Sequence, residues 1–290
     1  MAMTPRRLLD QVTSTVSYLR VADRADADPS LEWLPCAELV SNGERLLEVV
    51  RATAPGRGTD RDDIALSLFV QAYAFRVAST AIGSWLCSNR SHVLDVSPDN
   101  MFIALGRHRP NAVALSRLAF TDQPLAAAVF DDHLSRLVTT SHNTLANPGR
   151  QHIAERPSGE RPSGQRRLGE ATLWGNIAAG CASAFGAFHG AQDSIEGRAT
   201  VRRAATDFFH GAPPKAQSAG RFVEFAGEQP EPGWFWERSR CCLLYQIPPA
   251  DPTAEPFKCE DCSLWSSAQR QDRYALATQC SKEQNLEPDS

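Results

Sequence analysis

Residues 64–86 form the stretch I-A-L-S-L-F-V-Q-A-Y-A-F-R-V-A-S-T-A-I-G-S-W-L, which is apolar on nearly every side of a helix. Such a helix is either buried at the centre of a globular fold or spans a bilayer, which needs about 20 apolar residues. Arg76 and several Ser and Thr side chains interrupt the stretch, and a T-x-x-D capping signature occupies residues 59–62. We therefore predict a central buried helix over residues 62–88, with Arg76 at its edge or paired.

Apolar periodicity on both sides of this stretch predicts further helices. These are expected over residues 5–20, 37–53, from 122 onward, 174–188 and 192–209. Three short apolar runs, residues 92–96, 101–105 and 112–120, are separated by turn residues and predict a small β meander. The expected fold class is therefore mainly α with a small β meander, an α+β fold, followed by an irregular C-terminal module.

Changes in composition divide the chain into five regions. A tandem E-R-P-S-G repeat between residues 155 and 164 is too rich in proline, glycine and charge to bury a core, which predicts a flexible loop. The expected regions are a helical N-terminal region with short strands (1–145), a Pro/Gly/Arg-rich loop (146–168), a helical region packing on the first (169–230), a cysteine-containing module (231–280) and a polar tail (281–290).

The overall charge and the N-terminus limit the classes of function. The chain has 290 residues and a net charge of −4, which is not typical of a nucleic-acid-binding domain. Its N-terminus lacks the long apolar segment of a signal peptide, so we expect a cytoplasmic protein, or one peripheral to the inner face of the membrane, without a transmembrane segment. Eight cysteines in a reducing compartment indicate metal binding or redox chemistry rather than disulfides.

Four of these cysteines lie close together near the C-terminus. Cys241 and Cys242 are adjacent, and after sixteen residues Cys259 and Cys262 form a C-x-x-C knuckle. A compact set of four thiolates holds zinc or an iron–sulfur cluster. Zinc ribbons favour two such knuckles, whereas a [2Fe–2S] cluster can take ligands at two irons, one for each pair. The spacing alone leaves iron–sulfur, zinc and unliganded thiols open.

The sequence around the cysteines resembles a known motif. The pattern R-S-R-C-C-L-L-Y…C-E-D-C-S-L, which begins at residue 238, resembles the C-terminal cluster-binding motif of the FhuF-like ferric-siderophore reductases. A-Y-A-F-R at 72–76, D-V-S-P-D-N at 95–100 and L-W-G-N at 173–176 follow the same order, so the resemblance covers roughly residues 60–270. The proline-rich spacer between the two cysteine pairs is longer than in the family's best-known pattern, and we expect it to be an exposed insertion.

The resemblance implies a cofactor and a reaction. It implies a [2Fe–2S] cluster held by Cys241, Cys242, Cys259 and Cys262, and a cytoplasmic oxidoreductase that reduces Fe³⁺ to Fe²⁺ in a ferric siderophore, of the hydroxamate type, during iron acquisition. No nucleotide or flavin motif is present, so the electron donor is expected to be a ferredoxin, a flavoprotein or a small reductant. Two other functions stay open: an iron–sulfur electron-transfer or sensor protein without siderophore turnover, and a structural Cys₄ zinc protein.

Charged and aromatic residues flank the four cysteines, and no catalytic residue beyond the cluster is assigned. Arg238, Arg240 and Lys258 are candidates for tuning an anionic cluster or binding substrate, and the simpler interpretation is solvated charge. Trp234, Trp236 and Trp265 are candidates for shielding a cluster from water. By contrast, Cys181 and His133 lie on apolar helical faces and are expected in the core.

Overall fold

The computed structural model describes residues 2–106, 109–146, 168–226, 232–249, 251, 253–259 and 261–284. It is a mixed structure, 56% helical and 14% strand, which confirms the predicted α+β class. Residues 147–167, almost all of the predicted loop, lie outside the described residues, as do residues 285–290 of the predicted tail.

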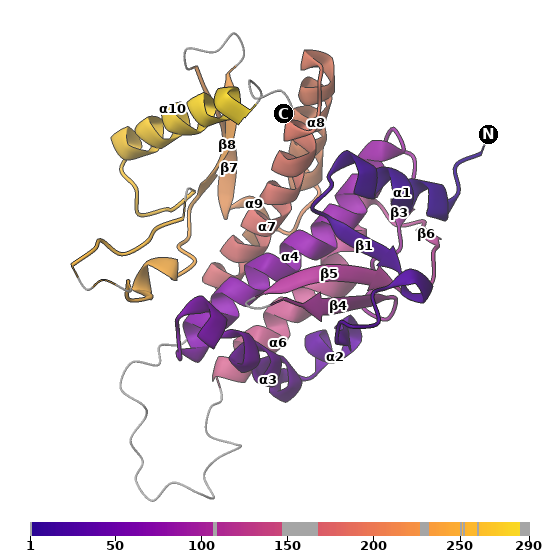
Figure 1. The fold of residues 1–290 in the computed structure, drawn as a ribbon, viewed down its shortest axis with the longest axis horizontal. Helices are drawn as coiled ribbons and strands as arrows, with labels where there is room; N and C mark the ends of the chain where they lie inside the picture. The colour runs from indigo at the N-terminus through magenta and orange to yellow at the C-terminus, as the bar shows by residue number, and fades with distance from the viewer. Residues whose placement is uncertain are drawn as a thin grey trace, which may run out of the picture.

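Two long helices lie at the centre of the molecule (Figure 1). Helix α4 (Asp62–Cys87) packs along α7 (Glu170–Gly190). Gly180 permits the close approach, because a Cβ atom at this position would lie 2.7 Å from the Gln71 carbonyl oxygen and 2.8 Å from the Phe75 nitrogen. By length and composition α4 could span a membrane, but 83% of its most apolar window is buried within the fold, in agreement with the predicted central helix.

Three shorter helices lie around this pair: α1 (Pro5–Thr15) packs at the C-terminal end of α4, and α3 (Gly43–Thr53) packs at its N-terminal end, next to α2 (Cys36–Ser41). The helix predicted over 5–20 ends earlier, and the chain continues as strand β1 (Arg20–Asp23). The helix predicted over 37–53 is interrupted at Asn42, whose side chain accepts hydrogen bonds from the N–H groups of Glu44 and Arg45. Asparagine is a strong N-cap residue, so α3 starts anew there.

The main sheet has four strands in the order β1-β5-β4-β2. Strands β4 (Met101–Leu105) and β5 (Pro110–Leu115) form the predicted antiparallel hairpin, β1 lies parallel to β5, and β2 (Trp33–Pro35) pairs with β4. The prediction of one continuous meander is wrong, because β3 (Val93–Leu94) and β6 (Phe120–Thr121) form a separate two-stranded sheet. Strands β1 and β2 were not predicted, since each has at most four residues.

Further helices complete the fold. They are α5 (Leu125–Val129), a π-helical turn η3 (Phe130–Leu134), α6 (Ser135–Ala146), α8 (Ile195–His210), α9 (Pro214–Gln217) and the short 3₁₀ turns η1 (Arg24–Asp26), η2 (Pro55–Arg57) and η4 (Leu244–Gln246). As predicted, His133 is a core residue. Its Nδ1 donates to the Val96 carbonyl oxygen and its Nε2 accepts from the Tyr73 hydroxyl, both at 2.6 Å.

The C-terminal part is built from a hairpin and a helix. Strands β7 (Gly220–Phe225) and β8 (Gly233–Arg238) pair across the boundary that we placed after residue 230. Helix α10 (Ser267–Gln284) was not predicted; it occupies part of the supposedly irregular module and the first residues of the supposed tail. The sequence of α10 has no apolar stripe; Tyr274, its one buried residue among those whose side chains are described, stacks on Phe235 of β8 at 4.1 Å.

Candidate metal centre

The first cysteine pair lies in a tight turn directly after β8. Leu243 follows the pair with a φ of 69°, a left-handed conformation that is rare for a large side chain. Its N–H donates to the Cys241 sulfur at 3.3 Å, and its carbonyl accepts from the Gln246 N–H at 2.9 Å. The strained turn therefore wraps backbone around the Cys241 sulfur.

Cys242 is anchored on the first turns of α4. It is 1% exposed and packs in a small apolar cluster with Ile64 and Leu68. Its carbonyl oxygen accepts a hydrogen bond from the Ser67 hydroxyl at 2.8 Å. The buried central helix α4 thus fixes the position of one of the four predicted ligands.

The second pair forms a knuckle closed by hydrogen bonds to one carbonyl oxygen. The Cys259 carbonyl accepts from the Cys262 N–H at 3.1 Å and from the Trp265 indole N–H at 3.0 Å. Trp265 in turn lies between two cations, with Lys258 Nζ 4.3 Å and Arg273 Cζ 4.0 Å from its ring centroid. Trp265 and Lys258 are therefore part of the support of the knuckle.

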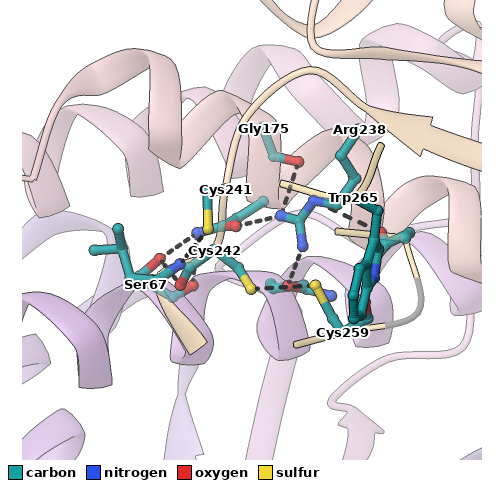
Figure 2. Close-up of polar contacts among 11 residues, drawn as sticks. Ser67, Gly175, Arg238, Cys241, Cys242, Cys259 and Trp265 are labelled. Atoms are coloured by element: carbon teal, nitrogen blue, oxygen red, sulfur yellow. Dashed lines mark hydrogen bonds and ion pairs between the residues drawn. The ribbon is translucent and has the colours of Figure 1, made fainter. Parts of the chain in front are cut away.

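The two pairs meet through Cys242 and Cys259, whose sulfur atoms lie 3.6 Å apart (Figure 2). Two sulfurs on one tetrahedral ion with bonds of about 2.3 Å would be separated by about 3.8 Å, so this spacing suits thiolates that share a metal. In the described part of the chain, no three His, Cys, Asp or Glu side chains are already grouped closely enough to hold an ion.

The thiols influence one another strongly. Hydrogen bonds from Cys241 and Cys259 lower the pKa of the Cys242 thiol far below its ordinary value, with a further contribution from the positive charge of Arg238. The same hydrogen bonds to Cys242, followed by burial, raise the pKa values of Cys241 and Cys259. Among these three thiols, Cys242 is thus the one favoured as the thiolate, which is the form that binds metal.

Arg238 is a buried cation beside the cysteines, with an exposed fraction of 2%. Its guanidinium donates to Gln71 Oε1 at 3.1 Å, to the Gly175 carbonyl oxygen at 3.5 Å and to Asn176 Oδ1 at 2.5 Å, and lies 3.6 Å from an Asp261 carboxylate oxygen (Figure 2). Its Nε makes no hydrogen bond to a described residue.

The charge of Arg238 is kept in place by its surroundings. Burial acts to lower the pKa of Arg238, but the negative charges of Asp261, Cys242 and Cys259 outweigh burial and raise it. A buried charge is tolerated only when it is paired and hydrogen-bonded. The donor set therefore fits an anionic centre: Cys242 and Cys259 interact with a permanent positive charge that has only one adjacent carboxylate among the described residues.

A chain of hydrogen bonds links this cation to α4. Asn176 of α7 donates to the Ser67 carbonyl oxygen at 2.8 Å and to the Ser67 hydroxyl at 2.7 Å while it accepts from Arg238. Sequence reasoning did not single out Ser67, Gln71 or Asp261. Asn176 lies within the L-W-G-N segment of the resemblance, and this segment was the sequence feature that could have identified it. Ser67 and Gln71 are ordinary polar interruptions of an apolar helix.

The remaining predicted residues differ in position. Arg240 is exposed. A Cβ atom added to Gly175 would lie 2.7 Å from the Cβ atom of Arg240, so the chain at Arg240 packs closely against α7. Trp236 belongs instead to an aromatic cluster between the hairpin and α8, where it stacks on Phe209 at 4.8 Å and meets Phe222 at 4.9 Å. No described contact joins Trp236 to a cysteine.

Three other cysteines with described side chains lie elsewhere. Cys181 and Cys36 are fully buried, and burial raises both pKa values, that of Cys36 to about 12. Cys87 contacts the Thr15 hydroxyl at 3.6 Å. They belong to the core and its edge, and the core position of Cys181 is the one predicted.

Comparison of the chain with protein-family models, curated proteins and solved structures finds no match. The resemblance of the cysteine motif therefore bears on function only as a proposal.

Proposed function

We propose that Cys241, Cys242, Cys259 and Cys262 hold a [2Fe–2S] cluster and that the protein is a ferric-siderophore reductase. The observation that carries this proposal is the meeting of Cys242 and Cys259 beside the buried Arg238. A Cys₄-ligated [2Fe–2S] centre is anionic, so a fixed cation beside it favours its retention and its reduced state.

The residues around the thiols have separate tasks. Ser67 fixes the backbone at Cys242, and Asn176 orients both Ser67 and Arg238. Trp265 holds the knuckle in place through its hydrogen bond to the Cys259 carbonyl oxygen. Hydrogen bonding, charge and solvent exposure are the properties with which proteins set a cluster potential.

When bound, the cluster supplies single electrons, which an external ferredoxin, flavoprotein or small reductant must provide. Fe³⁺ in a siderophore is held by hard oxygen donors, and it becomes Fe²⁺ when it gains one electron. Fe²⁺ carries less charge and is held more weakly by the same donors, so it passes to other chelators. The protein has to bind the ferric complex near the cysteine module; it does not have to break a covalent bond.

A reduction assay tests the proposal. Chemically reduced protein is mixed with a ferric hydroxamate and a ferrous-specific chelator under anaerobic conditions. Formation of the ferrous chelate with wild type, and its absence with Cys242→Ser, is the expected result. A reducible cluster signal without Fe²⁺ formation from any siderophore would reject the reductase and leave an electron-transfer or sensor protein.

A further inference from the structure

Arg76 is a buried arginine in the middle of α4, away from the cysteines. It is 8% exposed, its Nε donates to the Pro110 carbonyl oxygen at 3.4 Å, and its guanidinium lies 5.3 Å from the centroid of the Phe75 ring. Its Nη1 is buried and makes no hydrogen bond to a described residue. Because buried donors in proteins are nearly always paired, this unpaired nitrogen marks a corner that holds positive charge without a described acceptor.

Two more arginines lie at the same corner. Arg109 directly precedes Pro110, the first residue of β5, and Arg20 begins β1, where it lies opposite Ala112 of β5. Both side chains are exposed. Burial is the main cause that lowers the pKa of Arg76 to about 10. The positive charges of Arg109 and Arg20 also lower this pKa, whereas Tyr18 opposes the shift. Among the described residues no carboxylate contributes to this shift, so the positive charge is not neutralised.

One face of α4 connects this corner with the cysteines. Leu68, Ala72 and Arg76 follow one another at i+4 and therefore share a face of the helix. Leu68 packs with Cys242, and Ala72 and Phe75 are partly exposed on a helix that is otherwise mostly buried. Arg76 is displaced from Leu68 by eight residues, about 12 Å along the axis. Figure 1 shows α4 running between the four-stranded sheet and the C-terminal module.

We propose that Ala72, Phe75, Arg76 and Arg109, the arginine patch, bind a net anionic metal complex that carries carboxylate groups. This rests on the proposed function, because the complex is its ferric substrate. Arginine forks bind carboxylates in bidentate fashion, and the Phe75 ring and Ala72 offer apolar contact to the carbon skeleton of the chelator. The patch thus favours a carboxylate chelate over the uncharged hydroxamate that the resemblance implies.

Calorimetric titration with gallium citrate tests the patch without electron transfer, because Ga³⁺ has the charge of Fe³⁺ but is not reduced under these conditions. The anaerobically purified full-length protein should bind gallium citrate. Arg109→Gln and Arg76→Gln should each weaken binding about tenfold, the loss expected for one charge-assisted contact. Since Arg76 is buried and its variant can fail to fold, the exposed Arg109 decides the outcome.

Arg117→Gln is the matched control, because its side chain is 74% exposed and it lies beyond the opposite end of β5. It should bind like wild type, and a gallium trihydroxamate without carboxylates should bind at least about tenfold more weakly than gallium citrate. Equal affinity of wild type and Arg109→Gln, or equal affinity for the two complexes, overturns the patch. If the protein forms Fe²⁺ but shows either of these results, only the proposal of the arginine patch is rejected. If the protein binds gallium citrate but has no iron–sulfur signal, the reductase is rejected and the anion-binding site is retained.

Discussion

Asn176 and Ser67, on different central helices, are joined by two hydrogen bonds of 2.8 and 2.7 Å, and together they connect Arg238 with the Cys242 carbonyl group. All four residues are buried. Neither helix alone positions the cysteine turn; the contact between them does.

Replacement of Asn176 by Ala tests this connection. The change removes the acceptor for Arg238 and the donor to Ser67, and buried groups left unpaired should cost about 2–4 kcal/mol of unfolding free energy. Urea denaturation measures this loss, and metal analysis should show reduced metal content. Gln123→Ala removes an exposed carboxamide before α5 and should change neither. Similar stability of the two variants would contradict the account.

Cys242 and Cys181 form a matched pair of buried thiols, 1% and 0% exposed. Cys242→Ser should lose the metal and its visible absorbance, because a hydroxyl is a poor ligand in place of a thiolate. Cys181→Ser, in the core of α7, should keep both. Equal loss of iron in the two variants would mean that the ligand assignment is wrong.

Gly175 and Gly186 offer a second matched pair on α7. A Cβ at Gly175 would lie 2.7 Å from Arg240 Cβ, whereas nothing lies within 4 Å of one at Gly186. Gly175→Ala should displace the cysteine turn and reduce metal retention during dialysis against a chelator. Gly186→Ala should retain metal and raise the unfolding free energy by about 0.5–1 kcal/mol, because alanine favours a helix. Normal retention in Gly175→Ala would show that this contact does not position the turn.

His133 predicts acid sensitivity of the core. Burial lowers its pKa to about 4 from 6.5, helped by the charge of Arg136 and opposed by the hydrogen bond to Val96. Because the unfolded chain binds the proton first, His133 should cost stability as the pH falls from 6.5 towards about 4, by about 3 kcal/mol in total.

The test is the pH profile of the unfolding free energy. His133→Gln keeps a donor and an acceptor but cannot titrate in this range, so its profile should be flatter between pH 6.5 and 4. Tyr73→Phe removes the hydroxyl bonded to His133 Nε2 and should retain the slope. Parallel profiles of wild type and His133→Gln would exclude this histidine as the acid-sensitive group.

Much of the fold was predictable where one local signal dominates. The continuous apolar run at α4 and the stripe at α7 identify the central helices, and β-branched runs with turn residues identify β4 and β5. The break at Asn42 was missed because the apolar spacing continues across it. Strand β1 was missed because its pairing with β5 is set by residues about ninety positions away.

The candidate site was predictable only in part. The four cysteines stand out by their spacing, and Arg238 by its proximity to them. Ser67 and Gln71 could not be found, because their role arises from the packing of α4 against α7 and the C-terminal turn. Trp236 shows the opposite case: it is near the cysteines in sequence, but the pairing of β7 with β8 places it against α8.

The most direct test of the account is the spectrum of protein purified without oxygen, recorded before and after reduction by dithionite. The account predicts coloured protein with iron and sulfide in equal amounts, absorbance that bleaches on reduction, and a paramagnetic [2Fe–2S] signal in the reduced state. Colourless protein that carries zinc in place of iron would contradict it.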